Sequence, residues 1–196
     1  MNYKTLDYYN QNANQYANDT LGVSFHDLQD RFLRYLAPGS LILDFGCGAG
    51  RDSKYFTEKG FKVEAIDGSE ELVKIARKET GLPVRQMYFE ELNEYDKYDA
   101  IWACSSILHL KRDELKDVFA KMLRAVKPGG YIYTSFKCSE FEGFRVERYF
   151  TDFTEETFAA FLRDFPEISI VEKWVSGDVR PGRGSEQWLN LILSKL

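Results

Sequence analysis

Short apolar runs alternate with amphipathic stretches along most of this chain. The apolar runs predict strands at residues 41–43, 61–66, 84–89, 98–103, 131–136, 168–175 and 187–194. Apolar residues recur at helical spacing in the segments between them, which predicts helices at residues 24–36, 52–59, 69–79, 115–126 and 154–165. This alternation of strands and helices predicts an α/β fold in which a parallel sheet carries helices on both faces.

Three segments interrupt the pattern. Residues 1–23 are polar with interspersed tyrosines and have no strong period, as in a frayed leader whose tyrosines pack on the body. Residues 137–153 lose the alternation and are predicted to form a loop over a pocket, and residues 176–186 form a second loop. Because loops positioned by a rigid scaffold often carry specificity, we expect both later segments to border a substrate.

The stretch LILDFGCGAGR, which begins with the first predicted strand, is rich in glycine. Gly46, Gly48 and Gly50 alternate between this strand and the next helix. Glycine allows positive φ without steric cost and lets the backbone approach a ligand. The first N–H groups of the helix attract an anionic or hydrogen-bond-accepting group. Arg51 stands where a dinucleotide fingerprint has its third glycine. The alternative is a tight turn without a ligand, although three glycines exceed what a turn requires.

The form DFGCGAGR, with an acid ending the next predicted strand, resembles motif I of the class I S-adenosylmethionine-dependent methyltransferases. The resemblance covers about residues 40–136 well and the whole chain loosely, and the turn at residues 127–130, KPGG, adds to it. It implies a Rossmann-like, doubly wound, seven-stranded and mostly parallel sheet whose last strand is antiparallel. It also implies S-adenosyl-L-methionine as the cofactor.

The resemblance also implies which residues contact the cofactor. They are Tyr9, Tyr16, Asp44, Gly46, Cys47, Gly48, Arg51, Asp67, Gly68, Ser69, Phe89, Glu90, Ala103 and Cys104. Asp67 ends the second predicted strand and is expected to accept both ribose hydroxyls. Capping the following helix is its alternative role. Arg51 is a candidate for the carboxylate end of the cofactor or for the carbonyls of the glycine loop.

The remaining predicted contacts flank these residues. In the family an acid often follows the third strand, but Tyr88 stands near that position here, so Phe89 and Glu90 are our choice for the adenine. Glu90 as a solvated side chain is the alternative. An N-terminal helix covers the cofactor in related methyltransferases, and the spacing of Tyr9 and Tyr16 resembles such a lid.

Methyl transfer from a sulfonium is an in-line displacement whose donor is activated by its own positive charge. The protein has to align the acceptor lone pair and exclude water, so no catalytic triad is expected. His109 follows the fourth predicted strand and is the candidate general base, since imidazole titrates near neutral pH. A packing role is the alternative, and an acceptor that is already ionised would need no base.

Arginines and aromatic residues gather on the two later loops. The predicted substrate contacts are Arg145, Arg148, Tyr149, Arg180, Arg183 and Trp188. Convergence of the four arginines would favour an anionic acceptor, because guanidinium binds carboxylates and oxyanions bidentately. Pairing of these arginines with acids on the same loops is the alternative, and Trp188 is also a candidate core residue.

Length and composition limit the number of domains and the kinds of partner that the chain can have. The chain has 196 residues, 44% of them hydrophobic, which predicts a single methyltransferase domain over residues 1–196. Its net charge of −5 argues against a broad nucleic-acid footprint. No apolar run suits a membrane span, and no leader pattern is present, so we expect a cytoplasmic protein. We further expect a monomer or a homodimer that acts on a small molecule. Three scattered cysteines and two lone histidines predict no metal site.

The sequence therefore predicts a methyltransferase that acts on a small, possibly anionic, acceptor. The residues RDS after the glycine loop and the compact size are similar to tellurite-resistance-type and other small-molecule methyltransferases. Three alternatives stay open. They are a non-catalytic binder of S-adenosylmethionine or S-adenosylhomocysteine, a tRNA or protein methyltransferase, and a nicotinamide-dependent dehydrogenase, which Arg51 weakens.

Overall fold

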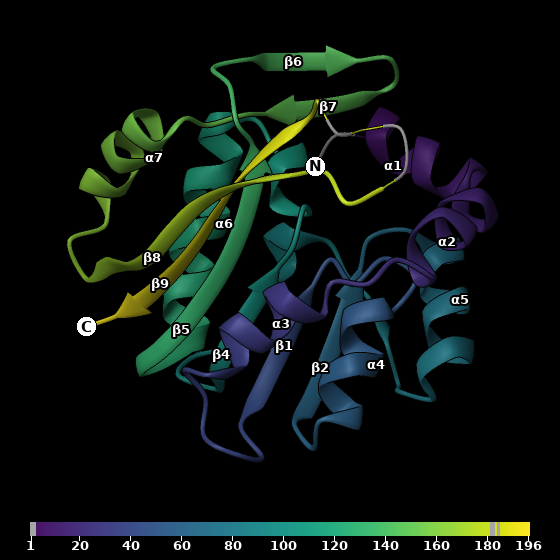
Figure 1. Cartoon of the computed structure of the whole chain (residues 1–196), viewed down its shortest axis with the longest axis horizontal. Helices are drawn as coiled ribbons and strands as arrows, with labels where there is room; N and C mark the ends of the chain where they lie inside the picture. The colour runs from purple at the N-terminus through teal and green to yellow at the C-terminus, as the bar shows by residue number, and fades with distance from the viewer. Residues whose placement is uncertain (1–2, 181–182, 184) are drawn as a thin grey trace.

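The structure is a computed structural model that describes residues 3–180, 183 and 185–196. Its main sheet consists of β1 (Leu41–Phe45), β2 (Lys62–Asp67), β3 (Arg85–Gln86), β4 (Tyr98–Ala103), β5 (Val126–Lys137), β8 (Ile168–Gly177) and β9 (Gln187–Lys195). The strand order is β3-β2-β1-β4-β5-β9-β8 (Figure 1). Neighbours from β3 to β5 pair in parallel, whereas β9 is antiparallel to both β5 and β8. The predicted mostly parallel sheet with an antiparallel last strand is confirmed.

Helices cover both faces of this sheet. The helices are α1 (Tyr3–Gln11), α2 (Ala13–Leu21), α3 (His26–Leu33), α4 (Arg51–Glu58), α5 (Glu70–Thr80), α6 (Arg112–Ala125) and α7 (Glu155–Phe161). Three short 3₁₀ turns accompany them, η1 (Phe89–Glu91), η2 (Ile107–His109) and η3 (Leu162–Asp164). In Figure 1, α3 and α4 lie in front of the sheet and α6 lies behind it.

Alternation along β1 explains the two covered faces. Ile42 is fully buried with Phe32 of α3 and Phe56 of α4. Its neighbour Leu43 belongs to the second core cluster, which includes Phe119 of α6 and further phenylalanines of α7. Successive side chains of a strand point to opposite faces, so one short apolar run contributes to both cores.

The N-terminal segment differs from a frayed leader. Residues 3–21 form two consecutive helices, α1 and α2, which pack at the carboxyl end of the sheet next to α5 (Figure 1). Ala13 and Ala17 are buried against Leu72 of α5. Small buried residues in an otherwise polar segment let these helices approach the body closely without a broad apolar stripe.

Several predicted boundaries are corrected. The segment 137–153 contains a hairpin, β6 (Glu142–Arg145) and β7 (Arg148–Thr151), rather than an irregular loop. The helix predicted at 24–36 begins at His26, and its N-cap position is Phe25 rather than Ser24. The third strand is reduced to two residues, and β5 includes the KPGG turn. No helix within the described residues has the length and apolar character that crossing a bilayer requires.

Candidate active site

The glycine loop connects β1 to α4 in a conformation that requires glycine. Gly46, Gly48 and Gly50 all have positive φ, of 88°, 56° and 91°. A Cβ on Gly46 would lie 2.5 Å from Cβ of Ser106, and one on Gly48 would lie 3.1 Å from the Tyr16 ring. The loop therefore needs left-handed backbone angles and also has side chains packed directly against it.

Asp67 lies at the carboxyl end of β2 and faces this loop. Its carboxylate accepts hydrogen bonds from the backbone N–H groups of Gly48, at 2.9 Å, and of Ser69, at 2.8 Å. Ser69 is the N-cap of α5, and its hydroxyl accepts from the N–H of Leu72. The capping role considered for Asp67 thus belongs to Ser69. Burial raises the pKa of Asp67, while the backbone donors oppose that rise.

A cavity of about 70 Å³, here called the glycine-loop cavity, lies beside these residues at the carboxyl ends of β1, β2 and β4. Ten of the sequence-predicted cofactor or catalytic residues line it. They are Tyr9, Tyr16, Gly46, Gly48, Asp67, Gly68, Ser69, Phe89, Cys104 and His109. Ligands of open α/β sheets bind at this edge, where the strand order reverses between β1 and β4.

Five other predicted cofactor residues do not line the glycine-loop cavity. Asp44 is buried and accepts a hydrogen bond from Ser53 of α4 at 2.5 Å, so it fastens that helix to β1. Ala103 is fully buried in the core, and Cys47 packs beside the cluster under α5. Glu90 lies on η1 away from the cavity wall, and Arg51 lines a second cavity instead. We exclude Asp44, Cys47, Glu90 and Ala103 from the contacts proposed below.

Helices α1 and α2 bring two tyrosines over the glycine loop. The rings of Tyr9 and Tyr16 meet edge to face with centroids 5.3 Å apart. Asn10 of α1 accepts a hydrogen bond from the Ser69 hydroxyl at 2.7 Å, and Thr5 accepts one from the N–H of Tyr149 at 2.9 Å. The N-terminal helices are therefore fastened both to the start of α5 and to the hairpin.

His109 connects the N-terminal helices to the hairpin. Its Nδ1 lies 2.6 Å from the carbonyl oxygen of Tyr149, and its Nε2 lies 2.8 Å from the hydroxyl of Tyr9. A carbonyl only accepts, so Nδ1 carries the proton and Nε2 accepts from the tyrosine. Burial lowers the pKa of His109 to about 4, which keeps the ring neutral. Hydrogen bonds engage both ring nitrogens, so neither is free to remove a proton from an acceptor.

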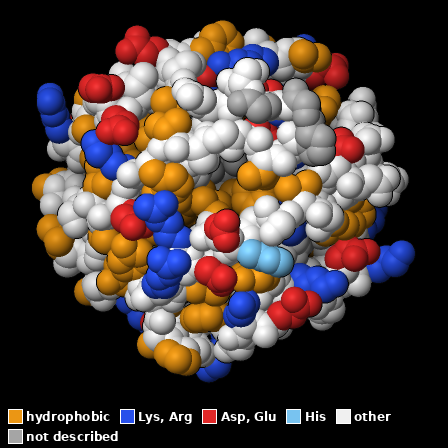
Figure 2. All heavy atoms as spheres, viewed as in Figure 1, with side chains coloured by type: hydrophobic (Ala, Val, Ile, Leu, Met, Phe, Trp, Pro, Cys, Tyr) orange, Lys and Arg blue, Asp and Glu red, His pale blue; other side chains and the backbone are white. Residues whose placement is uncertain are grey.

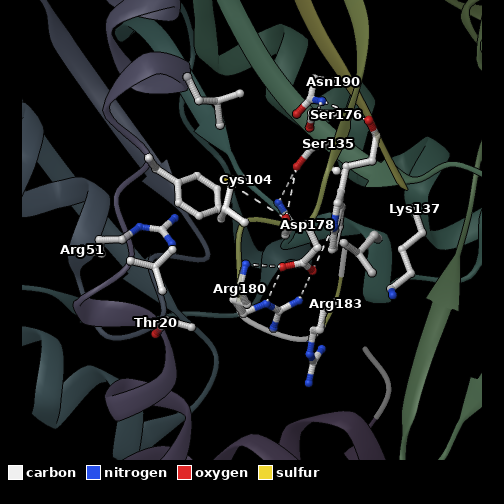
Figure 3. Close-up of a pocket in the computed structure, with 18 of the residues that line it drawn as sticks. Thr20, Arg51, Cys104, Ser135, Lys137, Ser176, Asp178, Arg180, Arg183 and Asn190 are labelled. Carbon is white, nitrogen blue, oxygen red and sulfur yellow. Dashed lines mark hydrogen bonds and ion pairs between the residues drawn. The ribbon is translucent and has the colours of Figure 1, made fainter. Parts of the chain in front are cut away.

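A second cavity of about 320 Å³, here called the large cavity and shown in Figure 3, shares lining residues with the first. It lies between α3, the carboxyl end of β5 and the start of the loop after β8. Five residues line both cavities: Tyr9, Tyr16, Cys104, Ser105 and His109. Ser105 has a φ of 51°, an unusual angle for a residue other than glycine. The unusual backbone therefore falls at the boundary between the two cavities.

Four of the six predicted substrate residues line the large cavity, namely Arg148, Arg180, Arg183 and Trp188. The other two do not. Arg145 makes two hydrogen bonds to the buried carboxylate of Asp152, and the Tyr149 hydroxyl donates to Glu142. These hydrogen bonds hold both side chains away from the large cavity, so Arg145 and Tyr149 are not among the proposed substrate contacts.

Sequence reasoning missed several residues of the large cavity. Phe25, Arg31, Lys137 and Trp174 all line it. The guanidinium of Arg31 lies 3.8 Å from the centre of the Trp174 ring, although 143 positions separate the two residues in the chain. Only the pairing of β8 with β9 and the position of α3 bring such residues together, so no local pattern could have indicated them.

Acidic side chains neutralise part of this cavity. Asp178 accepts two hydrogen bonds from the guanidinium of Arg180, at 2.9 and 2.5 Å, and one from the indole of Trp188 (Figure 3). Burial alone would raise the pKa of Asp178, but the bonds from Arg180 outweigh it and lower the pKa to about 2. Asp178 is therefore a structural counterion of Arg180 rather than a base.

The fold and the site together define a class of protein. Class I S-adenosylmethionine-dependent methyltransferases share three features with this structure. These are a glycine loop after β1, an acid at the end of β2, and an antiparallel strand, here β9, between β5 and the edge strand β8. A family model described as "Methyltransferase domain" matches residues 42–130. Over these residues the chain matches a methyltransferase domain, and its fold and site resemble those of class I methyltransferases.

Two relatives and one solved structure illustrate the match. The protein YqeM of Bacillus subtilis is 34% identical over an alignment 110 positions long, which covers 50% of this chain and 44% of YqeM. The S-adenosyl-L-methionine-dependent Diels-Alderase iliD of Neonectria is 33% identical over an alignment 117 positions long, which covers 57% of this chain and 45% of iliD. The chain thus matches less than half the length of either relative.

The solved structure is the 1,6-didemethyltoxoflavin-N1-methyltransferase of Burkholderia thailandensis, bound to its substrate and S-adenosylhomocysteine. It superimposes with a TM-score of 0.75 at 22% identity, and the match covers 99% of this chain and 86% of that one. At this level of identity the superposition establishes the shared fold alone.

Proposed function

We propose that this protein transfers a methyl group from S-adenosyl-L-methionine to a small anionic acceptor. The observation that carries the proposal is the pair of adjoining cavities, which share Tyr9, Tyr16, Cys104, Ser105 and His109. One cavity has the glycine loop and Asp67, and the other has basic and aromatic walls. A donor and an acceptor in these two cavities would meet at the shared residues.

The residues of the glycine-loop cavity suit the cofactor chemically. Each carboxylate oxygen of Asp67 accepts one backbone hydrogen bond and keeps lone pairs for further donors such as ribose hydroxyls. Phe89 offers an apolar wall for a purine. Gly46 lines the same cavity, and a side chain at this position would collide with Ser106. When bound, the cofactor supplies a methyl group that its own sulfonium charge activates.

In such a reaction the chain itself would position the acceptor against the methyl group and exclude water. Tyr9 and Tyr16 lie at the boundary between the cavities, and residues 177–180 and 183 line the large cavity. Neither His109 nor Asp178 offers a free base, since both are fully engaged in internal hydrogen bonds. The acceptor in this proposal therefore binds in its ionised form and needs no proton removal.

The lining of the large cavity supports an anionic acceptor. Six basic side chains border it, those of Arg31, Arg51, Lys137, Arg148, Arg180 and Arg183. Asp27 and Asp178 are the acidic residues among the described lining. Five of these basic side chains form ion pairs with Glu172, Asp52, Asp178 or Glu186, so Arg148 carries the charge that would attract an anion.

The proposal is tested by turnover of S-adenosylmethionine carrying a labelled methyl group. Purified protein is incubated with this donor and a panel of small carboxylates, thiols and phenols, and labelled products are separated from S-adenosylhomocysteine. The proposal expects label on at least one acid or thiol and on none of the matched neutral amides. Binding of S-adenosylhomocysteine without transfer to any acceptor would instead support a non-catalytic binder.

A further inference from the structure

Arg148 differs from the other basic residues of the large cavity. Arg31 pairs with Glu172 at 2.7 Å, Arg51 with Asp52 at 2.7 Å and Arg180 with Asp178 at 2.5 Å. Lys137 and Arg183 both pair with Glu186.

Within the described residues, no carboxylate forms an ion pair with Arg148. A half-buried guanidinium without a counterion has unmet bonding capacity that a bound anion would satisfy.

Aromatic rings, rather than acids, surround Arg148. Its guanidinium carbon lies 4.8 Å from the ring centre of Tyr8, 5.8 Å from that of Tyr9 and 5.3 Å from that of Phe150. Its Nη1 lies 3.4 Å from the Tyr9 hydroxyl, a long contact. These contacts hold the side chain in place without neutralising its charge or using all five of its donors.

The place of Arg148 in the fold is equally specific. It lines the large cavity, while its neighbour Tyr9 lines both cavities. An anion bound to Arg148 would therefore lie near the boundary at which the two cavities meet. Its partner across the hairpin, Arg145, has the same charge but is bound to Asp152.

The walls of the large cavity indicate the body of the ligand. The rings of Phe25, Tyr133, Phe150, Trp174 and Trp188 line it. Flat apolar walls with one unsatisfied cation fit a small planar molecule that carries one ionised group. A volume of about 320 Å³ is at the lower end of the range for small-molecule sites.

We propose that Arg148 is the specificity-determining residue of the large cavity and binds the ionised group of a small aromatic acid. This inference rests on the proposed methyltransferase function and adds to it the class of acceptor and the residue that selects it. Arg180 and the other basic residues keep their acidic partners and shape the cavity.

The test is calorimetric titration of protein saturated with S-adenosylhomocysteine, using benzoate and its neutral analogue benzamide as probes. The wild type should bind benzoate more tightly than benzamide by roughly tenfold or more, the size expected for charge-assisted hydrogen bonds. Arg148→Gln should abolish this preference, and Arg148→Lys should retain part of it because the charge remains. Arg163→Gln is the matched control, since Arg163 is exposed and lines neither cavity.

Each other outcome contradicts the inference. Equal binding of the two probes to the wild type, or no binding of either, would show that the cavity does not select aromatic acids. An unchanged preference in Arg148→Gln would remove Arg148 from the site. A weaker affinity for S-adenosylhomocysteine with an unchanged preference would assign Arg148 to holding the tyrosines of α1. If S-adenosylhomocysteine did not bind to the wild type at all, the proposed function would fail and this inference with it.

Discussion

The imidazole of His109 joins three parts of the chain through two hydrogen bonds. It lies on η2 after β4, donates to the carbonyl of Tyr149 on β7 and accepts from Tyr9 on α1. A protonated ring could not accept from Tyr9 and would add a second cation beside Arg148. The neutral form is therefore the one that fits the folded structure.

Stability should consequently fall as pH falls. Burial lowers the pKa of His109 in the folded chain to about 4, from the ordinary histidine value of 6.5 that applies when the chain is unfolded. Between these values the unfolded state binds more protons than the folded state, so acidification from pH 6.5 to pH 4 favours unfolding. The full difference corresponds to about 3 kcal/mol, an upper limit for this one group.

Denaturant unfolding at pH 7 and pH 5 measures this effect. The wild type should lose more stability between the two values than His109→Gln, which has no imidazole to titrate. His26→Gln, at a residue that stacks on Tyr55 outside this network, should behave as the wild type does. Equal pH dependence in wild type and His109→Gln would show that the buried imidazole does not control acid stability.

The sequence did not predict which arginines of the hairpin segment bind an acid and which line the cavity. The arginines of the 137–153 segment look alike in the sequence, yet Arg145 binds Asp152 and Arg148 faces the large cavity. The choice depends on the register of the hairpin and on which side chain reaches the buried acid, neither of which is a local property.

At the scale of elements, strands and helices with strong patterns were predicted closely. Strand β4, Tyr98–Ala103, has the predicted bounds, and α5 differs from its prediction by one residue at each end. The apolar run and the caps determine such elements locally. The hairpin β6–β7 was missed because its alternating positions carry charges and aromatic residues instead of a buried apolar face.

We predict that the N-terminal helices α1 and α2 form a movable lid over the cofactor site. The glycine-loop cavity of about 70 Å³ is smaller than the roughly 300 Å³ at which small-molecule sites begin. Tyr16 lies against Gly48, so a bound cofactor has to displace it. We expect α1 and α2 to open for the ligand and then to pack on it.

Hydrogen exchange measures this motion. Saturation with S-adenosylhomocysteine should slow amide exchange in residues 3–21, because the bound ligand adds contacts to both helices. Helix α7, none of whose residues line either cavity, serves as the internal control, and its exchange should be unchanged. Unaltered exchange in α1 and α2 with ligand bound would make these helices a fixed support rather than a lid.

At the scale of the whole molecule, charge is unevenly distributed. The chain carries a net charge of −5, and basic and acidic side chains are interspersed over the face seen in Figure 2. The basic residues of the large cavity come from α3, α4, β5, β7 and the loop after β8. Composition indicates the sign of the total charge but not this convergence of basic residues on one cavity, which depends on how distant elements meet.

The central claim is that the glycine loop and Asp67 bind S-adenosylmethionine or its product. Asp67→Ala should weaken binding of S-adenosylhomocysteine by about 1.5–3 kcal/mol, the range for hydrogen bonds to a charged group. Asp117→Ala, at an exposed position of α6, is the matched control and should bind normally. Thermal unfolding of both variants verifies that they remain folded.

The most direct measurement is calorimetric titration of the wild type and these two variants with S-adenosylhomocysteine and with NAD. We predict micromolar binding of S-adenosylhomocysteine to the wild type and to Asp117→Ala, weaker binding to Asp67→Ala, and no binding of NAD. Binding of NAD without S-adenosylhomocysteine, or the same affinity for S-adenosylhomocysteine in folded Asp67→Ala, would contradict the account.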